Sequence, residues 1–373
     1  MDHIQEFNSY IKNIKPEDKI TVVYHGFCGD GVCSAIITVK SLERTLERKV
    51  DITIHEPNVG FSNTLFEKLK TEKINKVIFV DLAIYKSIDI IKKAEKLFDI
   101  LVIDHHEYTN DLNSAKTTFI HSNFVNKNIP SNFYPASKLC YDLFSNLTNI
   151  EDLDWLSCLG LIADAGYKQW KEFLVKTMKR YGVKEKEDIF LTEFGKATAN
   201  ITSGESFSEH ADDVFEIIYN ANSHKQILNN KLLNECNKKV SDELKYWIDN
   251  RDKAERHKDL IIYVINPKYK IGSTLSTILS FQYFKNSTTI IIDTSTKVIS
   301  DEGYDYVKVS ARDQNINVKV NKLLEMATKS LKGAKAGGHM PAAGGIIKRE
   351  DMEIFKKKLI KFYDELTSNK HQP

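Results

Sequence analysis

The chain has 373 residues, of which 42% are hydrophobic and 28% are charged, a composition typical of a globular protein long enough to form two domains. No apolar stretch approaches the roughly 20 residues of a membrane-spanning helix, the N-terminal segment is too polar for a signal peptide, and five scattered cysteines argue against a disulfide framework, so we expect a cytoplasmic protein. The net charge of +2 indicates nothing about partners for the chain as a whole, so any attraction to nucleic acid must be local.

The first part of the chain alternates short apolar strands with amphipathic helices. Segments rich in β-branched and aliphatic residues predict strands over 19–25, 49–56, 76–82, 99–106 and 117–122. Helical periodicity predicts helices between them over 34–47, 63–73 and 86–98. This alternation is typical of an α/β fold with a parallel sheet, in which the helices are the crossover connections.

The pattern then becomes helical, and a second α/β region follows. A long charged segment without Pro or Gly, beginning at residue 229, predicts an exposed connecting helix. Beyond it, strands are predicted over 260–266, 288–294 and 305–313, and helices over 272–285, 317–331 and 349–366. We therefore expect an N-terminal domain with a helical insertion over 1–228, a connecting helix over 229–258 and a smaller C-terminal α/β domain over 259–373.

Polar residues stand at the carboxyl ends of the predicted N-terminal strands, and one more ends an apolar helix. They are His25, Asp30, Asp81, Asp104, His105, His106 and Asp164. Because the carboxyl ends of parallel strands share one edge of the sheet, these side chains can converge on one point. Carboxylates packed closely repel one another unless a cation compensates them. Mixed His and Asp ligands suit Mn²⁺, Zn²⁺, Fe²⁺ or Co²⁺ better than Ca²⁺.

Each of these residues alone has a plainer interpretation. A single Asp after a strand, such as Asp81, is most often a helix cap or a turn residue, and Asp164 can simply end its helix. His55 and His121 also stand near strand ends but lack acidic neighbours, so we expect them at the surface or at the edge of the core. The joint pattern is much stronger than any single part.

Five motifs carry a family resemblance. "HGFCGDGVCSA", "FVD", "DHH" and "ADAG" resemble the four motifs of the DHH phosphoesterase superfamily, and "GAKAGGHMPAAGG" (333–345) resembles the glycine-rich motif of the DHH-associated domain. Members include RecJ-like exonucleases, nano-RNases, cyclic-dinucleotide phosphodiesterases and family II pyrophosphatases. The glycine-rich domain is similar to that of the nuclease and phosphodiesterase branches and argues against a pyrophosphatase.

The resemblance implies a centre of two metal ions, usually Mn²⁺, although another divalent transition metal would also suit it. Its implied ligands are His25, Asp30, Asp81, His105 and Asp164. Asp81 would bridge the two ions, His106 would face the scissile phosphate, and Asp104 would orient a histidine.

Cys28 departs from the family pattern, because many relatives have an aspartate at this point of the first motif. One interpretation makes Cys28 a thiolate ligand, which would shift the metal preference away from Mg²⁺ and make the site oxidisable. The other makes it a space-filling side chain beside a site with one ligand fewer. Cys33, inside the following helix, is expected in the core.

The C-terminal domain supplies the expected substrate contacts. The resemblance assigns His339 and its glycine-rich segment, with Gly337 and Gly338, to terminal-phosphate or nucleotide binding, and Ser310 and Arg312 lie in a nearby strand. We expect the segment to form a turn whose amides face phosphate, although a plain glycine-rich turn is the alternative. Residues 305–349 hold nine Lys or Arg but only three acids, which suits a phosphodiester backbone.

These features predict a metal-dependent phosphodiesterase or exonuclease that releases nucleoside monophosphates from short or single-stranded RNA or DNA. Two alternatives stay open: a cyclic mono- or dinucleotide phosphodiesterase, and a catalytically impaired RecJ-like scaffold in a replication or repair complex. The retained motif residues argue against the scaffold, and only Cys28 supports it. Residues 167–225 have no assignable pattern and are a candidate surface for a homodimer or a protein partner.

Overall fold

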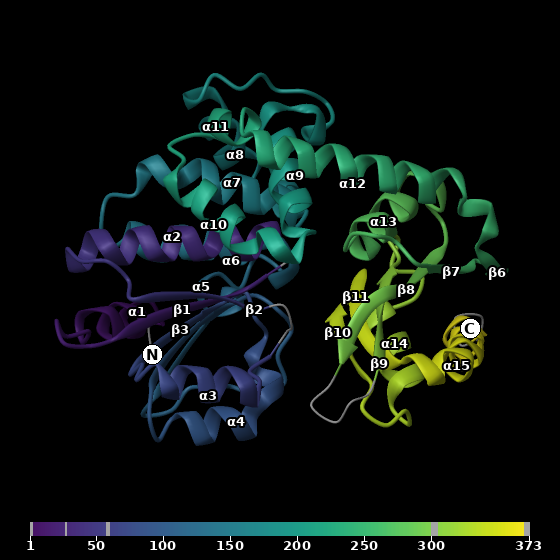
Figure 1. Ribbon diagram of the computed structural model, residues 1–373, viewed down its shortest axis with the longest axis horizontal. Helices are drawn as coiled ribbons and strands as arrows, with labels where there is room; N and C mark the ends of the chain where they lie inside the picture. Colours follow the sequence, from purple (N-terminus) through teal and green to yellow (C-terminus); the bar gives the residue numbers. More distant parts are fainter. Residues whose placement is uncertain (1–2, 27, 57–59, 300–304, 369–373) are drawn as a thin grey trace. The chain divides into compact units, whose positions relative to one another are not determined.

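The computed structural model describes residues 3–26, 28–56, 60–299 and 305–368 (Figure 1). The chain divides into an N-terminal unit, Met1–Asn237, and a C-terminal unit, Lys238–Pro373. Within the described residues, each unit has its own sheet and its own two hydrophobic cores.

Five parallel strands form the sheet of the N-terminal unit, in the order β2-β1-β3-β4-β5. They are β1 (Ile20–His25), β2 (Ile52–Glu56), β3 (Lys76–Val80), β4 (Asp99–Asp104) and β5 (Thr117–His121). The predicted parallel α/β sheet is confirmed, and the carboxyl ends of all five strands lie at one edge.

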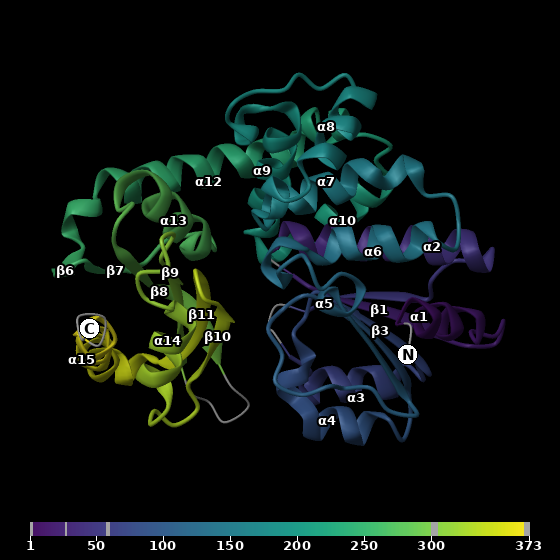
Figure 2. The ribbon, with the colours of Figure 1, turned by 180° about the vertical axis from the view of Figure 1, so that it is seen from behind.

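Helices cover both faces of this sheet, as Figures 1 and 2 show. One core contains residues of α1 (His3–Lys12), α2 (Gly29–Leu46), α6 (Ala136–Ser145) and α7 (Asp154–Ala163). The core on the other face contains residues of α3 (Asn63–Thr71) and α4 (Ile88–Ala94). Because both faces are covered, the central strands are continuous apolar runs rather than alternating ones.

The helical region over 167–225 packs into the same core as α2 and α7. It contains α8 (Lys171–Arg180), α9 (Glu193–Glu205), α10 (Ala211–Asn220) and α11 (His224–Leu228). The short helix α5 (Ser122–Val125) lies outside this region and directly follows β5. Leu174, Phe194, Ile201 and Val214 are buried in this core. The region is therefore an integral helical layer of the N-terminal unit.

α12 (Lys231–Asp249) begins within the N-terminal unit and continues into the C-terminal unit. It ends earlier than the predicted connecting helix, and the side chain of Asn250, the residue after it, donates a hydrogen bond to the carbonyl of Tyr246 in the last turn. Asparagine competes for backbone hydrogen bonds in this way and disfavours helix interiors. The residues that follow form a turn and a short strand, β6 (Glu255–His257).

The sheet of the C-terminal unit has six strands in the order β10-β11-β9-β8-β7-β6. After β6 come β7 (Leu260–Ile265), β8 (Thr288–Ile299), β9 (Asp305–Arg312), β10 (Lys335–His339) and β11 (Ala342–Lys348). Only the β7–β8 pair is parallel. The helices of this unit are α13 (Gly272–Ile278), which continues as a π-turn over Leu279–Tyr283, α14 (Val320–Thr328) and α15 (Met352–Ser368). α14 and α15 share one core with the sheet, and α13 shares another.

The glycine-rich segment is a β-hairpin: the predicted turn is limited to two residues, and two strands that were not predicted flank it. β10 and β11 pair over five residues, with Met340 and Pro341 between them. A Cβ atom on Gly345 would lie 2.6 Å from the carbonyl oxygen of Lys335, so glycine lets the two strands approach.

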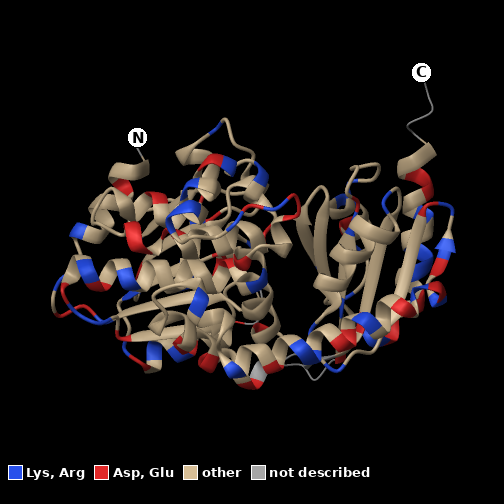
Figure 3. Cartoon of the chain, turned by 90° about the horizontal axis from the view of Figure 1, so that it is seen from above, with Lys and Arg blue, Asp and Glu red and all other residues tan. Residues whose placement is uncertain are grey.

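Figure 3 shows that Lys and Arg are interspersed with Asp and Glu over both units. Among the described residues, none of the helices combines the length and the apolar character that crossing a membrane requires.

Candidate metal centre

The predicted ligands flank the point where the strand order of the N-terminal sheet reverses. β1 lies between β2 and β3, and the chain leaves β1 and β3 towards opposite faces of the sheet. His25 ends β1, Cys28 and Asp30 lie at the start of α2, and Asp81 directly follows β3. Open parallel sheets bind ligands at this kind of switch point, because diverging helices leave a crevice at the strand ends.

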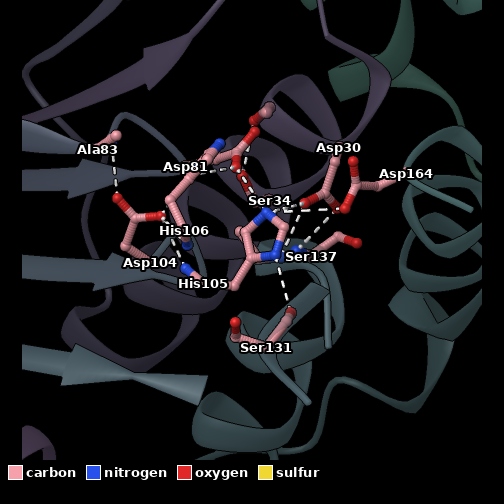
Figure 4. Close-up of polar contacts among 12 residues, drawn as sticks. Asp30, Ser34, Asp81, Ala83, Asp104, His105, His106, Ser131, Ser137 and Asp164 are labelled. Atoms are coloured by element: carbon pink, nitrogen blue, oxygen red, sulfur yellow. Dashed lines mark hydrogen bonds and ion pairs between the residues drawn. The ribbon is translucent and has the colours of Figure 1, made fainter. Parts of the chain in front are cut away.

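The structure brings all six predicted metal ligands together, with His106 beside them. Figure 4 shows Asp30, Asp81, His105 and Asp164 of this set, together with His106. Their donor atoms form three groups, in each of which all atoms lie within 4.8 Å of one another. The groups are His25, Cys28 and Asp81; Asp81, His105 and His106; and Asp30, His105 and Asp164. Two of the residues, Asp81 and His105, each belong to two groups.

His105 is oriented by a backbone carbonyl. Its Nδ1 lies 3.1 Å from the oxygen of Ser131, which can only accept a hydrogen bond, so Nδ1 carries the proton. Its Nε2 lies 3.3 Å from Asp81, 3.7 Å from Asp164 and 4.0 Å from Asp30. Burial opposes a charged imidazolium here, but the carboxylates raise the pKa of His105 well above its ordinary value. A nitrogen lone pair that faces three carboxylates needs a proton or a metal ion between them.

Asp30 is fully buried and is held by the first turn of α6. Its carboxylate accepts hydrogen bonds from the backbone N–H of Ala136 at 2.7 Å and of Ser137 at 3.0 Å. Burial and the neighbouring Asp81 carboxylate raise the pKa of Asp30 to about 7. The helix N-terminus therefore fixes this carboxylate in place, while its environment resists a negative charge that no cation balances.

Asp81 has a left-handed backbone, with φ of 56°, which is uncommon for a residue other than glycine. Its Oδ1 atom is buried and accepts no hydrogen bond from any described residue. Close packing holds the residue there: a Cβ atom on Gly31 would lie 2.1 Å from the carbonyl oxygen of His25 and 3.2 Å from Oδ2 of Asp81. Strained residues with unsatisfied buried atoms are typical of functional sites.

Asp104 organises the loop after β4. It accepts hydrogen bonds from the N–H groups of Ala83 at 2.6 Å, His105 at 2.7 Å and His106 at 3.1 Å, and from Nδ1 of His106 at 2.7 Å. Burial opposes ionisation of Asp104, but the two imidazoles hold its pKa well below the ordinary value. Burial also opposes the charge on His106, yet Asp104 raises the pKa of His106. The pair is thus built to orient His106 and to favour its protonated form.

Cys28 immediately precedes α2 and has an extended backbone. Burial, followed by the charges of Asp81, Asp30 and Asp164, raises the pKa of the Cys28 thiol well above its ordinary value, and a hydrogen bond with the N–H of Gly31 opposes this. A cation among these carboxylates would reverse the effect of their charges and favour the thiolate. Cys33, as expected, is fully buried in the core.

The predicted substrate residues lie in rows across the C-terminal sheet. Gly344 pairs with both Ser310 and Gly337, and Ala342 pairs with both Arg312 and His339. Side chains two residues apart on a strand share a face, so Ser310, Arg312 and His339 lie on the same face of the sheet. Gly338 is one residue out of phase with them and has a φ of 138°.

Arg312 is held by the helix beside this face. Its guanidinium donates hydrogen bonds to Oγ of Ser273 at 3.0 Å and Oγ1 of Thr277 at 3.3 Å, both on α13. Sequence reasoning missed these two hydroxyls, because they lie far from Arg312 in the chain and have no motif of their own.

Comparison with known proteins identifies both halves of the chain. The family model described as "DHH family, N-terminal domain" matches residues 19–164, and that of the "DHHA1 domain" matches residues 271–365. The chain belongs to the DHH phosphoesterase superfamily. A search of the curated proteins finds no match.

Solved structures share this DHH fold. RecJ in complex with Mn²⁺ from Thermus thermophilus is 14% identical with a TM-score of 0.70; the match covers 97% of this chain but only 55% of that chain. The DHH domain of a protein assigned to a family of ribosomal proteins is 16% identical with a TM-score of 0.69, covering 96% of this chain and 90% of that one. Exonuclease RecJ bound to manganese is 15% identical with a TM-score of 0.65, covering 96% and 94%.

The residues of the DHH domain fit a divalent cation. The donor set mixes imidazole nitrogens, carboxylates and one sulfur atom. The buried Oδ1 of Asp81 accepts no well-formed hydrogen bond from the described residues, and it lies 3.3 Å from Nε2 of His105, which faces carboxylates. A cation would satisfy both atoms at once.

Two histidines of the DHH domain have partners that the sequence did not indicate. His121 is fully buried, contrary to the expectation of a position at the surface or the core edge; its Nε2 donates to the carbonyl of His106 at 2.9 Å, and its Nδ1 accepts from the N–H of Asn123 at 3.1 Å. His55 was expected to lack acidic neighbours, but Glu205 of α9 lies 3.7 Å from its Nε2. One sequence signal could have indicated that His121 has a structural role: its position at the carboxyl end of a predicted strand.

Proposed function

We propose that the chain is a phosphodiesterase that uses two divalent metal ions, Mn²⁺ in our proposal, to release nucleoside monophosphates from short or single-stranded oligonucleotides. The observation that carries the proposal is the convergence of three overlapping donor groups at the switch point of the DHH sheet. Membership of a phosphoesterase superfamily supports the reaction class.

The proposed metal ligands are those six convergent residues: His25, Cys28, Asp30, Asp81, His105 and Asp164. Asp81 is the proposed bridging ligand, because its carboxylate belongs to both the His25 group and the His105 group. Two divalent ions, when bound, would supply an activated water and would stabilise the attacking and leaving oxygens of the displacement.

His106 is the proposed contact to the scissile phosphate. Asp104 holds its Nδ1 at 2.7 Å, which orients the ring, and we assign Nε2 to the phosphate contact. Because Asp104 also raises the pKa of His106, the ring can carry a positive charge towards an anionic phosphate and donate a hydrogen bond to it.

The C-terminal unit is the proposed substrate-binding part. Arg312, Ser310 and His339 share one face of its sheet, and Gly337 and Gly338 keep β10 free of bulky side chains. A guanidinium can bind a phosphate through two hydrogen bonds, which suits a phosphodiester chain. The excess of Lys and Arg over 305–349 supports a nucleic acid over a small neutral ligand.

The test is Mn²⁺-dependent hydrolysis of end-labelled RNA and DNA, from dinucleotides to about twenty nucleotides, a range around the usual site size of single-strand binding folds. We expect stepwise release of mononucleotides. Asp81→Asn is expected to lower the rate by more than about 100-fold, since even outer-shell partners of metal sites change activity by 10–100-fold. Asp89→Asn, a matched change at an exposed residue of α4, is expected to leave the rate unchanged.

Other outcomes would redirect the assignment. Cleavage of a cyclic dinucleotide without cleavage of any oligomer would replace the exonuclease with a cyclic-nucleotide phosphodiesterase. Absence of both hydrolysis and metal binding would overturn the proposal in favour of a scaffold.

A further inference from the structure

The centre offers two chemically different sets of donors. The group of His25, Cys28 and Asp81 supplies a nitrogen, a sulfur and an oxygen. The group of Asp30, His105 and Asp164 supplies a nitrogen and two carboxylates. These two groups share no residue, so each could hold an ion of its own.

Cys28 follows β1 in the chain and directly precedes α2. His25 ends a central strand of the sheet, and α2, an 18-residue helix, begins directly after Cys28. The donor atom of Cys28 lies within 4.8 Å of those of His25 and Asp81, and a metal ion bound there would displace the thiol proton, because the thiolate is the form that binds metals.

The two donor groups carry the same total charge, and they differ in how soft their donor atoms are. With Cys28 ionised, the first group carries two negative charges, from Cys28 and Asp81. The second also carries two, from Asp30 and Asp164. Each group therefore balances one divalent cation, and the sulfur is what distinguishes them. Thiolates prefer zinc and similar borderline-soft ions, whereas carboxylates suit manganese and magnesium.

We infer that the centre is heterometallic: the Cys28 group selects a thiophilic ion such as Zn²⁺, Co²⁺ or Fe²⁺, and the Asp30 group takes an oxygen-preferring ion such as Mn²⁺. This inference rests on the proposed two-ion centre, and it replaces one of the two proposed Mn²⁺ ions with a thiophilic ion. It also assigns Cys28 a role that an aspartate could not fill.

The first experiment measures metal content. Metal-free full-length protein is dialysed against equal concentrations of Zn²⁺ and Mn²⁺, and the bound ions are counted by mass spectrometry. We expect one zinc and one manganese for each wild-type chain. Cys28→Asp keeps the negative charge but replaces sulfur with oxygen, so it is expected to lose zinc selectivity by at least tenfold and to bind manganese in both positions.

The second experiment reads the metal–sulfur bond directly. Titration of the metal-free protein with Co²⁺ is expected to give a thiolate-to-cobalt charge-transfer band that saturates at one equivalent. The band is expected to be absent in Cys28→Asp and retained in Cys33→Ser, which alters a buried cysteine that belongs to none of the donor groups. Wild-type protein tests the inference even if a variant does not fold.

The outcomes separate this inference from the proposed function. Hydrolysis with two manganese ions and no cobalt–sulfur band would overturn the heterometallic centre and leave the phosphodiesterase intact. A band with one zinc and one manganese, but no hydrolysis of any oligomer, would support the centre and overturn the proposed substrate. Identical metal content in wild type and Cys28→Asp would overturn the inference.

Discussion

Asp30 and Asp104 are buried carboxylates, and backbone amides hold both of them. The amides of Ala136 and Ser137 hold Asp30, and the amide of Ala83 is among those that hold Asp104. Amide dipoles orient a carboxylate without neutralising it, so the negative charge stays available to a cation. These donors are positioned before any ion binds.

His121 gives a prediction about the pH dependence of stability. Burial lowers the pKa of His121, and its neutral ring uses both nitrogens, so a proton on Nδ1 would oppose the N–H of Asn123. The unfolded chain binds this proton more readily than the folded one, so stability is greatest above the ordinary histidine pKa and falls as the pH drops below it. The loss is at most about 1.4 kcal/mol per pH unit.

The measurement is urea unfolding between pH 5 and pH 8 in the presence of EDTA. We expect His121→Asn to have a shallower dependence of unfolding free energy on pH than wild type, whatever its overall stability. Equal slopes in wild type and His121→Asn would contradict the assignment of a neutral buried ring.

Residue patterns predicted the motif side chains of the centre but not the groups that hold them. The Asp-His-His run and the strand-final Asp81 were visible because acids and histidines rarely end apolar strands. The carbonyl of Ser131 and the amides of α6 are backbone groups, and a backbone group leaves no trace in the residue type. Glu205 meets His55 only through the packing of α9, which periodicity cannot place.

Among the elements, the β10–β11 hairpin has two adjacent glycines with different surroundings. A Cβ atom on Gly345 would lie 2.6 Å from the oxygen of Lys335, whereas a Cβ atom on Gly344 would meet only the oxygen of Val309, at an ordinary 3.5 Å. Position 345 therefore requires glycine so that β10 and β11 can approach each other, whereas position 344 has room for a methyl group.

We therefore expect Gly345→Ala to destabilise the C-terminal unit by about 1–3 kcal/mol through overpacking. Gly344→Ala is the matched control, and we expect it to leave the melting temperature unchanged. The added methyl group would lie on the same face of the sheet as Ser310, so we expect this variant to have a higher KM for an oligonucleotide. Thermal unfolding by circular dichroism and steady-state kinetics measure the two effects. Equal melting temperatures for the two variants would count against the close approach at Gly345.

Strands were predicted well where apolar residues form them and poorly where they do not. The five strands of the DHH sheet were found because both of its faces are buried. β10 and β11 were missed because glycine and alanine have low strand propensity, and β6 because it has only three residues. These strands form because neighbouring strands pair with them, and the local sequence contains no signal for that pairing.

At the scale of the whole molecule, every donor of the proposed centre belongs to the N-terminal unit. An ion that binds only the folded unit stabilises it by about 2.7 kcal/mol at 100 times its dissociation constant. In calorimetry of the full-length protein, we expect two unfolding transitions, of which Mn²⁺ raises only one, by several degrees. Asp81→Asn is expected to abolish the increase. A single transition, or an equal increase of both, would show that the units do not unfold independently.

The donors are also spread along the chain, from the end of β1 to the residue after α7. During synthesis, the ribosome would release His25 long before Asp164, and parallel strands pair only after long crossover segments have been made. A nascent chain would therefore expose Cys28 and the histidines as separate, weak ligands until most of the DHH domain had emerged. The protein would therefore bind its metal ions late in synthesis and folding. A shortage of ions would leave a folded sheet whose carboxyl-terminal edge is acidic and strained.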